Sequence, residues 1–545
     1  MSRETIQQLG AEVWAWRIAT SFTTGDDIPR VDHAPDWLPQ FSTDAIEKCR
    51  QQLAEYRDRW LAITATDQPV SVQVDYRLIG SALARVEWDI NTLRNWEKDA
   101  VFLTSQILGP WFDRLLQVPP FSAERQQALV VAAKAIPAQV EVAKTNLARA
   151  GVRTLATIAA EMLADIETQF LESVEKLQGF VDAAVFDELR DLARGAAAAL
   201  GEFGRWLRDN ADSMVQDDPV GRDKFIWYLR NVALIAAEPE DMVRAARQDY
   251  QRAVVSETLV TNRYRNLAPD KLSANVAEQV TRQALQEQQV RDFYEAENLL
   301  TQPNSLRHYL IGALPEYVKP LRWLGVTDDL TSEQRLDMDG ISYAPDPTPT
   351  LPYFYAANAR DPRLGIVHEG AHYQQLALSG AHENPLRRRY YDSAANEGIG
   401  FYNEEMMMLA GLFADAPHSE EVIHNFNRLR SLRVIADVNL ATGEFSLHDA
   451  TQFFVDLVPM DRETALGESA MYVATPGLAM SYHVGKMLLM RMMTDAINEQ
   501  KDQFSIRAFH DYVWLNGNVP FSLQRWELLG DRSDIDVLDG KASAG

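Results

Sequence analysis

Cysteine is almost absent from the sequence, since Cys49 is the only one among 545 residues. A single thiol excludes an intramolecular disulfide framework and any zinc or iron–sulfur site built from several cysteines. The chain also has no run approaching the roughly 18 uninterrupted apolar residues of a membrane-spanning helix. Its first residues show no basic region followed by an apolar stretch, the pattern of a signal peptide. We therefore expect a cytoplasmic protein with no membrane partner.

Positive charge is also scarce. Lys and Arg number 53 against 78 Asp and Glu, which gives a formal net charge of −25. Such a chain repels phosphate backbones, so no nucleic acid is expected as a partner. Hydrophobic residues make up 46% and charged residues 24% of the sequence, as in an ordinary globular protein with a packed core. The oligomeric state is left open.

Strand signals are few and helical signals dominate. In the segments 122–212, 223–266 and 269–300, apolar residues recur every three or four positions among good helix formers, and Pro239-Glu240-Asp241 marks a helix start. The exception is Gly340–Ala357, where aromatic residues stand among four prolines and indicate an extended or hairpin segment. These patterns predict a mainly α protein.

No internal repeat divides the chain. We place a soft boundary near residue 300, between an N-terminal helical half, residues 1–300, and a C-terminal half, residues 301–545, which holds the candidate chemistry. One continuous helical body is the alternative.

The most informative motif is His368-Glu369-Gly370-Ala371-His372. Residues i and i+4 lie on one face of a helix, so the two imidazoles can converge on one metal ion with Glu369 beside them. Zinc suits this arrangement, because three protein ligands leave a fourth position for a water whose pKa falls to about 7. Glu369 can then take the proton of that water. The alternative is a helix that happens to carry one buried and one solvent-facing histidine.

A third ligand is expected from a following helix, and Glu397 is the best candidate. It lies 25 residues after His372, which allows a helix, a loop through Pro385 and an antiparallel return. Asp392 or Ser393 can cap the second helix. Glu404, seven residues beyond Glu397, lies on nearly the same face of the helix. It either orients a metal ligand by hydrogen bonding or is solvated.

Several runs of the sequence together resemble one family. They are the HExxH motif, the Glu-Gly-x-x-x-Tyr-x-Glu run from Glu397 to Glu404, Pro476–Lys486, and Phe509–Val513 followed by Asn516–Pro520, with a weaker match at Gly221–Phe225. These runs resemble domain-of-unknown-function family 885 (DUF885). The resemblance implies a largely helical zinc metallopeptidase of the HExxH, gluzincin, type, akin to the helical oligopeptidases and carboxypeptidases. Ala441 stands where the family tends to have histidine, so no substrate role is carried over to that position.

The resemblance also implies site residues outside the metal cluster. It places a functional tyrosine at Tyr482, which we expect to donate a hydrogen bond to the oxyanion. His483 lies about 100° further round the helix and is a second catalytic candidate, with a structural role as the alternative. Lys486, one turn beyond Tyr482, can hold a peptide's C-terminal carboxylate or extend to solvent. Arg433 is a further carboxylate candidate from its family position alone.

The aromatic run Tyr353-Phe354-Tyr355 lies just upstream of the HExxH motif. In zincins an edge strand at this place pairs with the substrate backbone, so by analogy we expect Tyr355 to line the cleft and bind substrate. The alternative for these aromatic side chains is an ordinary core position.

Two other classes of protein remain open. A carboxylate-bridged di-iron bundle would use Glu369-x-x-His372, a second copy at Glu421-x-x-His424, and Glu397 between them. This scheme leaves His368 without a role, and Glu421 lies where a helix cap is expected. A non-catalytic helical binding scaffold is the third class.

Taken together, the residues and the resemblance predict a metallopeptidase. Its fold is a large helical, zincin-like body with a deep cleft and a small β-hairpin or short sheet beside the metal helix. One Zn²⁺ per chain is bound by His368, His372 and Glu397, and Glu369 activates the water. The substrate is a short peptide, because an enclosed helical cleft excludes folded proteins, and the mode is carboxypeptidase, dipeptidase or oligopeptidase.

Overall fold

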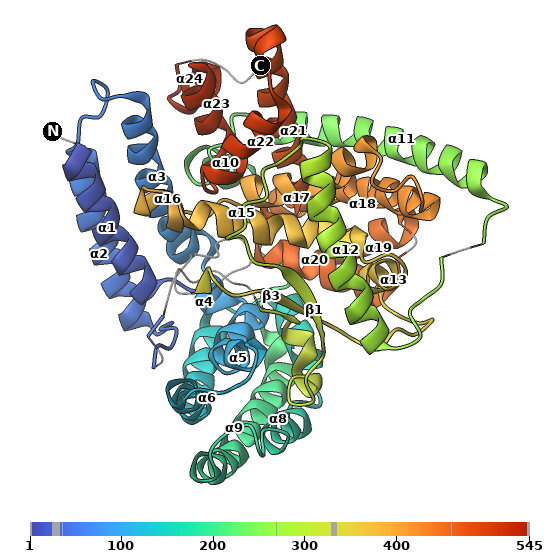
Figure 1. Ribbon diagram of the computed structural model, residues 1–545. Helices are drawn as coiled ribbons and strands as arrows, with labels where there is room; N and C mark the ends of the chain where they lie inside the picture. The colour runs from blue at the N-terminus through green and yellow to red at the C-terminus, as the bar shows by residue number, and fades with distance from the viewer. Residues whose placement is uncertain are drawn as a thin grey trace.

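The computed structural model describes residues 3–23, 33–34, 36–268, 270–328, 335–458 and 460–541. Helices make up most of this chain and three short strands form one sheet, which confirms the prediction of a mainly α protein with a short sheet. In Figure 1 helices α5, α6, α8 and α9 lie below the sheet, and the C-terminal helices lie above it. None of the described helices combines the length and the apolarity that a bilayer crossing requires.

The N-terminal elements are helical throughout. They are α1 (Arg3–Thr20), α2 (Thr43–Leu61), α3 (Val70–Glu87), η1 (Trp88–Leu93), α4 (Asn95–Lys98), α5 (Ala100–Leu116), α6 (Ala123–Ala150), α7 (Arg153–Met162), α8 (Ile166–Glu175), α9 (Ala183–Asn210), η2 (Ala211–Ser213), α10 (Arg222–Asn231), α11 (Pro239–Tyr264) and α12 (Val276–Ala296). Helix α6 begins after Ser122, whose hydroxyl accepts a hydrogen bond from the Arg125 amide at 3.2 Å. The predicted start at Pro239 is confirmed by α11.

The remaining elements surround the sheet and form the C-terminal body. They are β1 (Tyr309–Ala313), η3 (Lys319–Leu324), β2 (Thr327–Asp328), β3 (Gly340–Ala344), α13 (Tyr353–Arg360), α14 (Arg363–Gly365), η5 (Ile366–Gly370), α15 (Ala371–Gly380), α16 (Pro385–Arg389), α17 (Ser393–Ala410), α18 (Pro417–Thr442), α19 (Leu447–Leu457), α20 (Arg462–Ala474), α21 (Leu478–Gln500), η6 (Lys501–Gln503), α22 (Ile506–Leu515), α23 (Phe521–Leu529) and α24 (Ser533–Leu538).

The sheet has the strand order β1-β3-β2. Strand β1 pairs with β3 in parallel, from Tyr309 opposite Gly340 to Ala313 opposite Ala344, and β2 pairs with β3 in antiparallel register. The extended segment predicted at 340–357 is therefore correct for β3. It is wrong for residues 353–355, which begin helix α13.

Tertiary packing explains this difference. Pro352 is the residue before α13, where its fixed φ and missing amide donor are tolerated. The aromatic rings then pack on helix α18, with the Phe354 and Phe426 ring centroids 5.5 Å apart and those of Tyr353 and Phe426 5.8 Å apart. Burial of these rings against another helix outweighs the strand preference of aromatic residues. Tyr355 is consequently on a helix, and no substrate-pairing strand forms at this place.

Each of the three large hydrophobic clusters includes residues from both sides of residue 300. Helix α11, for example, packs along α18. This arrangement agrees with one continuous body, and the division near residue 300 stays a prediction.

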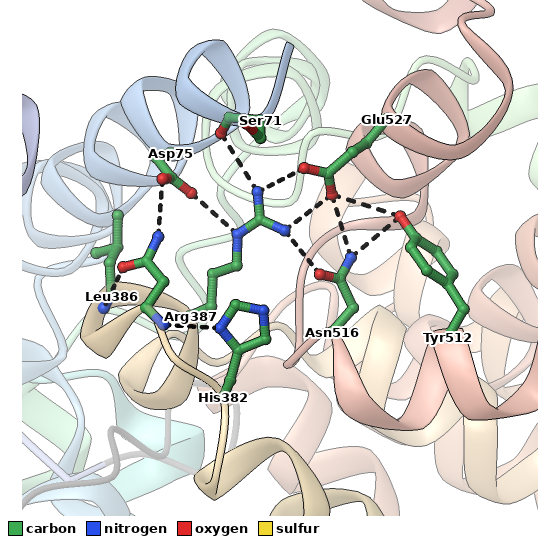
Figure 2. Close-up of polar contacts among 9 residues, drawn as sticks. Ser71, Asp75, His382, Leu386, Arg387, Tyr512, Asn516 and Glu527 are labelled. Atoms are coloured by element: carbon green, nitrogen blue, oxygen red, sulfur yellow. Dashed lines mark hydrogen bonds and ion pairs between the residues drawn. The ribbon is translucent and has the colours of Figure 1, made fainter. Parts of the chain in front are cut away.

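A buried arginine ties the N-terminal and C-terminal helices together (Figure 2). Arg387 of α16 is 5% exposed and lies 3.0 Å from the Asp75 carboxylate of α3 and 2.7 Å from that of Glu527 on α23. It also donates to the side chain of Asn516 at 2.7 Å. Burial raises the pKa of Asp75, although Arg387 opposes the shift. Since a buried charge without its partner is costly, this network fixes α16, which follows the helix of the HExxH motif, against α3.

Candidate metal centre

The HExxH motif spans a junction between two kinds of helix. His368 and Glu369 belong to the π-helical turn η5, and His372 lies in the first turn of α15. The sequence predicts a regular α-helix from His368 to His372, and the π-helical turn departs from that prediction. Such turns insert one extra residue and are frequent at functional sites. The two Nε2 atoms nevertheless meet, 3.2 Å apart.

Glu397 completes the cluster from helix α17. Its Oε2 lies 3.1 Å from Nε2 of His372 and 3.5 Å from Nε2 of His368. Among the described residues this trio is the only group of three or more His, Cys, Asp or Glu that could hold a metal ion. In a tetrahedral site, bonds of about 2.0–2.1 Å hold the ligand atoms about 3.3–3.4 Å apart. The three observed separations fit that spacing, so one point can lie about 2 Å from all three atoms.

Small residues allow the ligand helices to approach. Asp392 caps α17 by accepting a hydrogen bond from the Ala395 amide at 3.0 Å, which starts the helix one turn before Glu397. A Cβ on Gly398 would lie 2.5 Å from the backbone carbon of Gly485 on α21. A Cβ on Gly400 would lie 2.7 Å from Cε1 of His372. The glycines beside Glu397 therefore bring α17 against both the imidazoles and α21.

The charges around the cluster favour a cation at its centre. Burial and the nearby Arg430 lower the pKa of His368, but the carboxylates of Glu404 and Glu397 outweigh them and raise it to about 9. Burial would raise the pKa of Glu397, but the two histidines outweigh it and lower that pKa well below its usual range. Both shifts stabilise positive charge beside the Glu397 carboxylate. The donor set, two imidazoles and one carboxylate, fits zinc.

Glu369 and Tyr355 face the same pocket. Glu369 is exposed, and both residues line a cavity of about 300 Å³ between the sheet and helices α12 and α13. The negative charge of Glu369 acts on Tyr355, whose pKa is raised by burial and by that charge. The predicted deep cleft between two helical halves stays a prediction, because this pocket is small and lies beside the sheet.

Tyr482 also lies at the centre. Its ring stacks on that of His368 with centroids 5.9 Å apart and planes 5° from parallel. Burial and the Glu397 charge raise the pKa of Tyr482 well above its ordinary value. The hydroxyl therefore keeps its proton at neutral pH and can act as a hydrogen-bond donor.

Three other predicted site residues are paired with carboxylates. Nε2 of His483 lies 2.7 Å from Asp249 on α11, so this imidazole is not brought to the histidine pair. Lys486 forms an ion pair with Glu405, and the Arg433 guanidinium lies 2.7 Å from Glu468. A substrate carboxylate would have to break one of these buried pairs, which argues against the substrate-binding roles predicted for Lys486 and Arg433. Arg433 still borders the site, because its guanidinium lies 4.8 Å from the Tyr482 ring centroid.

Sequence reasoning missed two supporting residues on α18. Arg430, 4% exposed, lies 2.8 Å from Glu404. Asp437 accepts hydrogen bonds from the Gly477 and Met480 amides, each at 2.9 Å, and so caps α21, the helix that carries Tyr482. Charged residues within an otherwise apolar stretch of α18 are the signal that could have revealed both, because buried charges need partners.

The second Glu-x-x-His motif does not join the cluster. Glu421 lies 3.4 Å from His418 in the first turns of α18. The metal-capable trio of the described residues includes neither Glu421 nor His424. Within the described part of the chain, the di-iron alternative therefore has no second set of ligands.

The comparisons with known proteins identify a family without an assigned activity. The model described as bacterial protein of unknown function (DUF885) matches residues 23–527. None of the curated proteins matches the chain. Two solved structures are similar: a predicted lipoprotein of unknown function from Shewanella oneidensis (15% identity, TM-score 0.69, 97% of this chain and 100% of that one), and a predicted lipoprotein from Colwellia psychrerythraea (14% identity, TM-score 0.74, 98% and 100%). These likenesses show the fold alone, and the predicted cytoplasmic location stays a prediction.

Proposed function

The chain belongs to the DUF885 family, and from its candidate metal centre we propose that it is a zinc-dependent peptidase acting on short peptides. One observation carries the proposal. Two imidazole nitrogens and one carboxylate oxygen converge with separations of 3.1–3.5 Å, and an exposed glutamate stands next to the first histidine. This donor set leaves a coordination position free for catalysis.

His368, His372 and Glu397 would hold the ion. When bound, zinc acts as a Lewis acid that makes water nucleophilic at neutral pH and polarises a carbonyl group. The other residues of the centre then have distinct tasks. Glu369 takes a proton from the water that attacks the scissile carbonyl carbon, and it delivers that proton to the leaving nitrogen as the C–N bond breaks. Tyr482, which keeps its hydroxyl proton, donates a hydrogen bond to the developing oxyanion.

The surroundings favour a short, extended substrate. The pocket beside Glu369 has a volume of about 300 Å³, at the lower end for ligand sites. Lys486 and Arg433, the expected partners of a terminal carboxylate, are engaged in ion pairs. Of the three modes predicted from the sequence, this favours an oligopeptidase over a carboxypeptidase or a dipeptidase.

Metal analysis together with a peptide library tests the proposal. We expect one zinc per chain by elemental mass spectrometry, and cleavage of library peptides that stops on chelation and returns with zinc. Glu369→Gln should keep the zinc and lose turnover by about 10²- to 10⁴-fold, as expected for loss of a general base. Iron bound in pairs would support the oxidoreductase class instead. Intact peptides after incubation with the zinc-loaded protein would refute the peptidase.

A further inference from the structure

Helix α12 presents two buried glutamines, Gln279 and Gln283, one helical turn apart on the face toward the sheet. Gln283 binds backbone: its Nε2 donates to the Tyr309 carbonyl at 2.9 Å, and its Oε1 accepts from the Ile311 amide at 3.1 Å. These groups lie on the edge of β1 that is not paired with β3. The side-chain amide of Gln283 thus forms the hydrogen bonds that a neighbouring strand would form with this edge.

Gln279 carries the same side-chain amide, but no described backbone group forms a hydrogen bond with its oxygen. Its side chain is 4% exposed, and its buried Oε1 accepts no hydrogen bond from any described residue. It lines the pocket that also contains Glu369. A buried acceptor left without a hydrogen bond destabilises the fold, because it has lost its contact with water. A ligand that offers a donor to Oε1 would remove that destabilisation.

The pocket wall indicates what kind of ligand this is. Glu369 is the one charged residue among the described residues that line it, and the other polar side chains, including Ser342 and Asn358, are uncharged. A carboxylate would be repelled by Glu369 and would find no cation on this wall. An uncharged group with both a donor and an acceptor, such as a peptide unit, matches a primary amide.

We propose that Gln279 binds the backbone of the substrate, and this proposal rests on the peptidase function above. Its Oε1 accepts a hydrogen bond from a substrate N–H and its Nε2 donates to a substrate carbonyl, as Gln283 does for β1. The pocket then recognises a peptide unit beside the scissile bond. The substrates are accordingly peptides of at least three residues, with no requirement for a free C-terminus.

Binding to the zinc-loaded Glu369→Gln protein separates recognition from turnover. The probe is a library of neutral pentapeptides blocked at both ends, followed by versions of the tightest binder in which each backbone nitrogen is methylated in turn. Gln279→Leu should weaken binding about five- to tenfold, the value of one or two hydrogen bonds. Methylation of one nitrogen should weaken binding to the Gln279-containing protein by a similar factor and have no further effect in Gln279→Leu.

Gln286→Leu is the matched control, because Gln286 also carries a buried unpaired Oε1 on α12 but does not line the pocket. It should change binding less than twofold. Gln279→Leu should melt at the same or a higher temperature than its parent, since it removes an unpaired buried amide. If Gln279→Leu had a lower melting temperature and bound the peptides as tightly as its parent, the role of Gln279 would be structural. That result would overturn the proposal.

The outcomes also separate the two proposals. If Gln279→Leu changes neither the cleavage nor the binding of blocked peptides, the proposed backbone contact is wrong. The peptidase proposal is then unaffected. Cleavage only of peptides with a free C-terminus would overturn the contact in the same way. If the zinc-loaded protein neither binds nor cleaves any peptide, both proposals fall.

Discussion

Nδ1 of His368 lies 2.7 Å from Oε1 of Glu404, a carboxylate that is 1% exposed. The same oxygen lies 2.8 Å from Arg430 on α18. A proton on Nδ1 held by Glu404 leaves Nε2 with its lone pair directed at His372 and Glu397, as a metal ligand requires. In the proposed zinc centre, helix α17 would therefore supply both a ligand, Glu397, and the group that orients a second ligand, His368.

Glu404→Gln tests this orienting role. The amide lacks the charge that polarises the His368 imidazole, so zinc affinity should fall about 10- to 100-fold. Competition with a chromogenic chelator measures the affinity, and circular dichroism verifies the fold. Glu405→Gln is the neighbouring control: Glu405 pairs with Lys486, so this variant should lose stability while its zinc affinity stays within twofold. Equal affinity in Glu404→Gln and the parent protein would contradict the role.

Tyr482→Phe tests the oxyanion donor. The ring can keep its stacking on His368, while the hydroxyl is lost. We expect kcat to fall by about 10²- to 10³-fold with zinc affinity and KM nearly unchanged, the usual effect of removing one such donor. Tyr472→Phe is the control, because the hydroxyl of Tyr472 donates to Glu468 instead. Unaltered kcat in Tyr482→Phe would remove Tyr482 from the mechanism.

Gly400→Ala tests the close packing of α17 on the imidazoles. Its Cβ would lie 2.7 Å from Cε1 and 3.0 Å from Nε2 of His372, so the ring must shift. Zinc affinity should fall by at least tenfold, whereas the better helix propensity of alanine, about 1 kcal/mol, offsets part of the strain in the free energy of unfolding. Gly467→Ala, a helical glycine with nothing within 4 Å of its added Cβ, should raise stability and leave the metal centre unchanged. Parental zinc affinity in Gly400→Ala would contradict this packing.

Much of the fold follows from local sequence signals. The helical periodicity predicts α6 to α9, and Pro239 predicts the start of α11. The i, i+4 histidines and the spacing to Glu397 predict which side chains converge, because helix geometry relates sequence spacing to a shared face. The DUF885 resemblance is confirmed by the family match over residues 23–527.

The features that the sequence does not predict depend on contacts between segments that are distant in the sequence. Strand-favouring aromatics at 353–355 are helical because they pack on Phe426, some 70 positions later. Lys486 shares a face with Tyr482 in principle, but Glu405 pairs with it. The unpaired amide of Gln279 becomes visible only when the sheet, α12 and α13 enclose one pocket. Such pairings depend on tertiary packing, which periodicity does not encode.

A buried helix cap outside the site provides a pH test of the fold. Asp99 is 0% exposed and accepts hydrogen bonds from the Val101 and Phe102 amides at 2.8 and 3.0 Å, which caps α5. Burial raises the pKa of Asp99 to about 6, although the two amides and Lys98 oppose the shift. The unfolded chain has a pKa of about 3.9 here, so between pH 4 and 6 the folded state binds the proton more tightly. Ionisation of Asp99 therefore lowers stability as pH rises through this window.

Asp99→Asn should remove this pH dependence, because asparagine caps a helix without titrating. Relative to the parent protein, its free energy of unfolding should rise by up to about 3 kcal/mol between pH 4 and pH 7, measured by denaturant titration at each pH. Asp461→Asn is the control of opposite sign. Asp461 is an exposed cap of α20, and its hydrogen bonds to Thr464 lower its pKa, so it stabilises the fold above its unfolded pKa and loses that effect in acid. Relative to the parent protein, Asp461→Asn should therefore be less stable at pH 7 than at pH 4. If the free energies of unfolding of the two variants, each relative to the parent, changed with pH in the same direction, the assignment of Asp99 would be refuted.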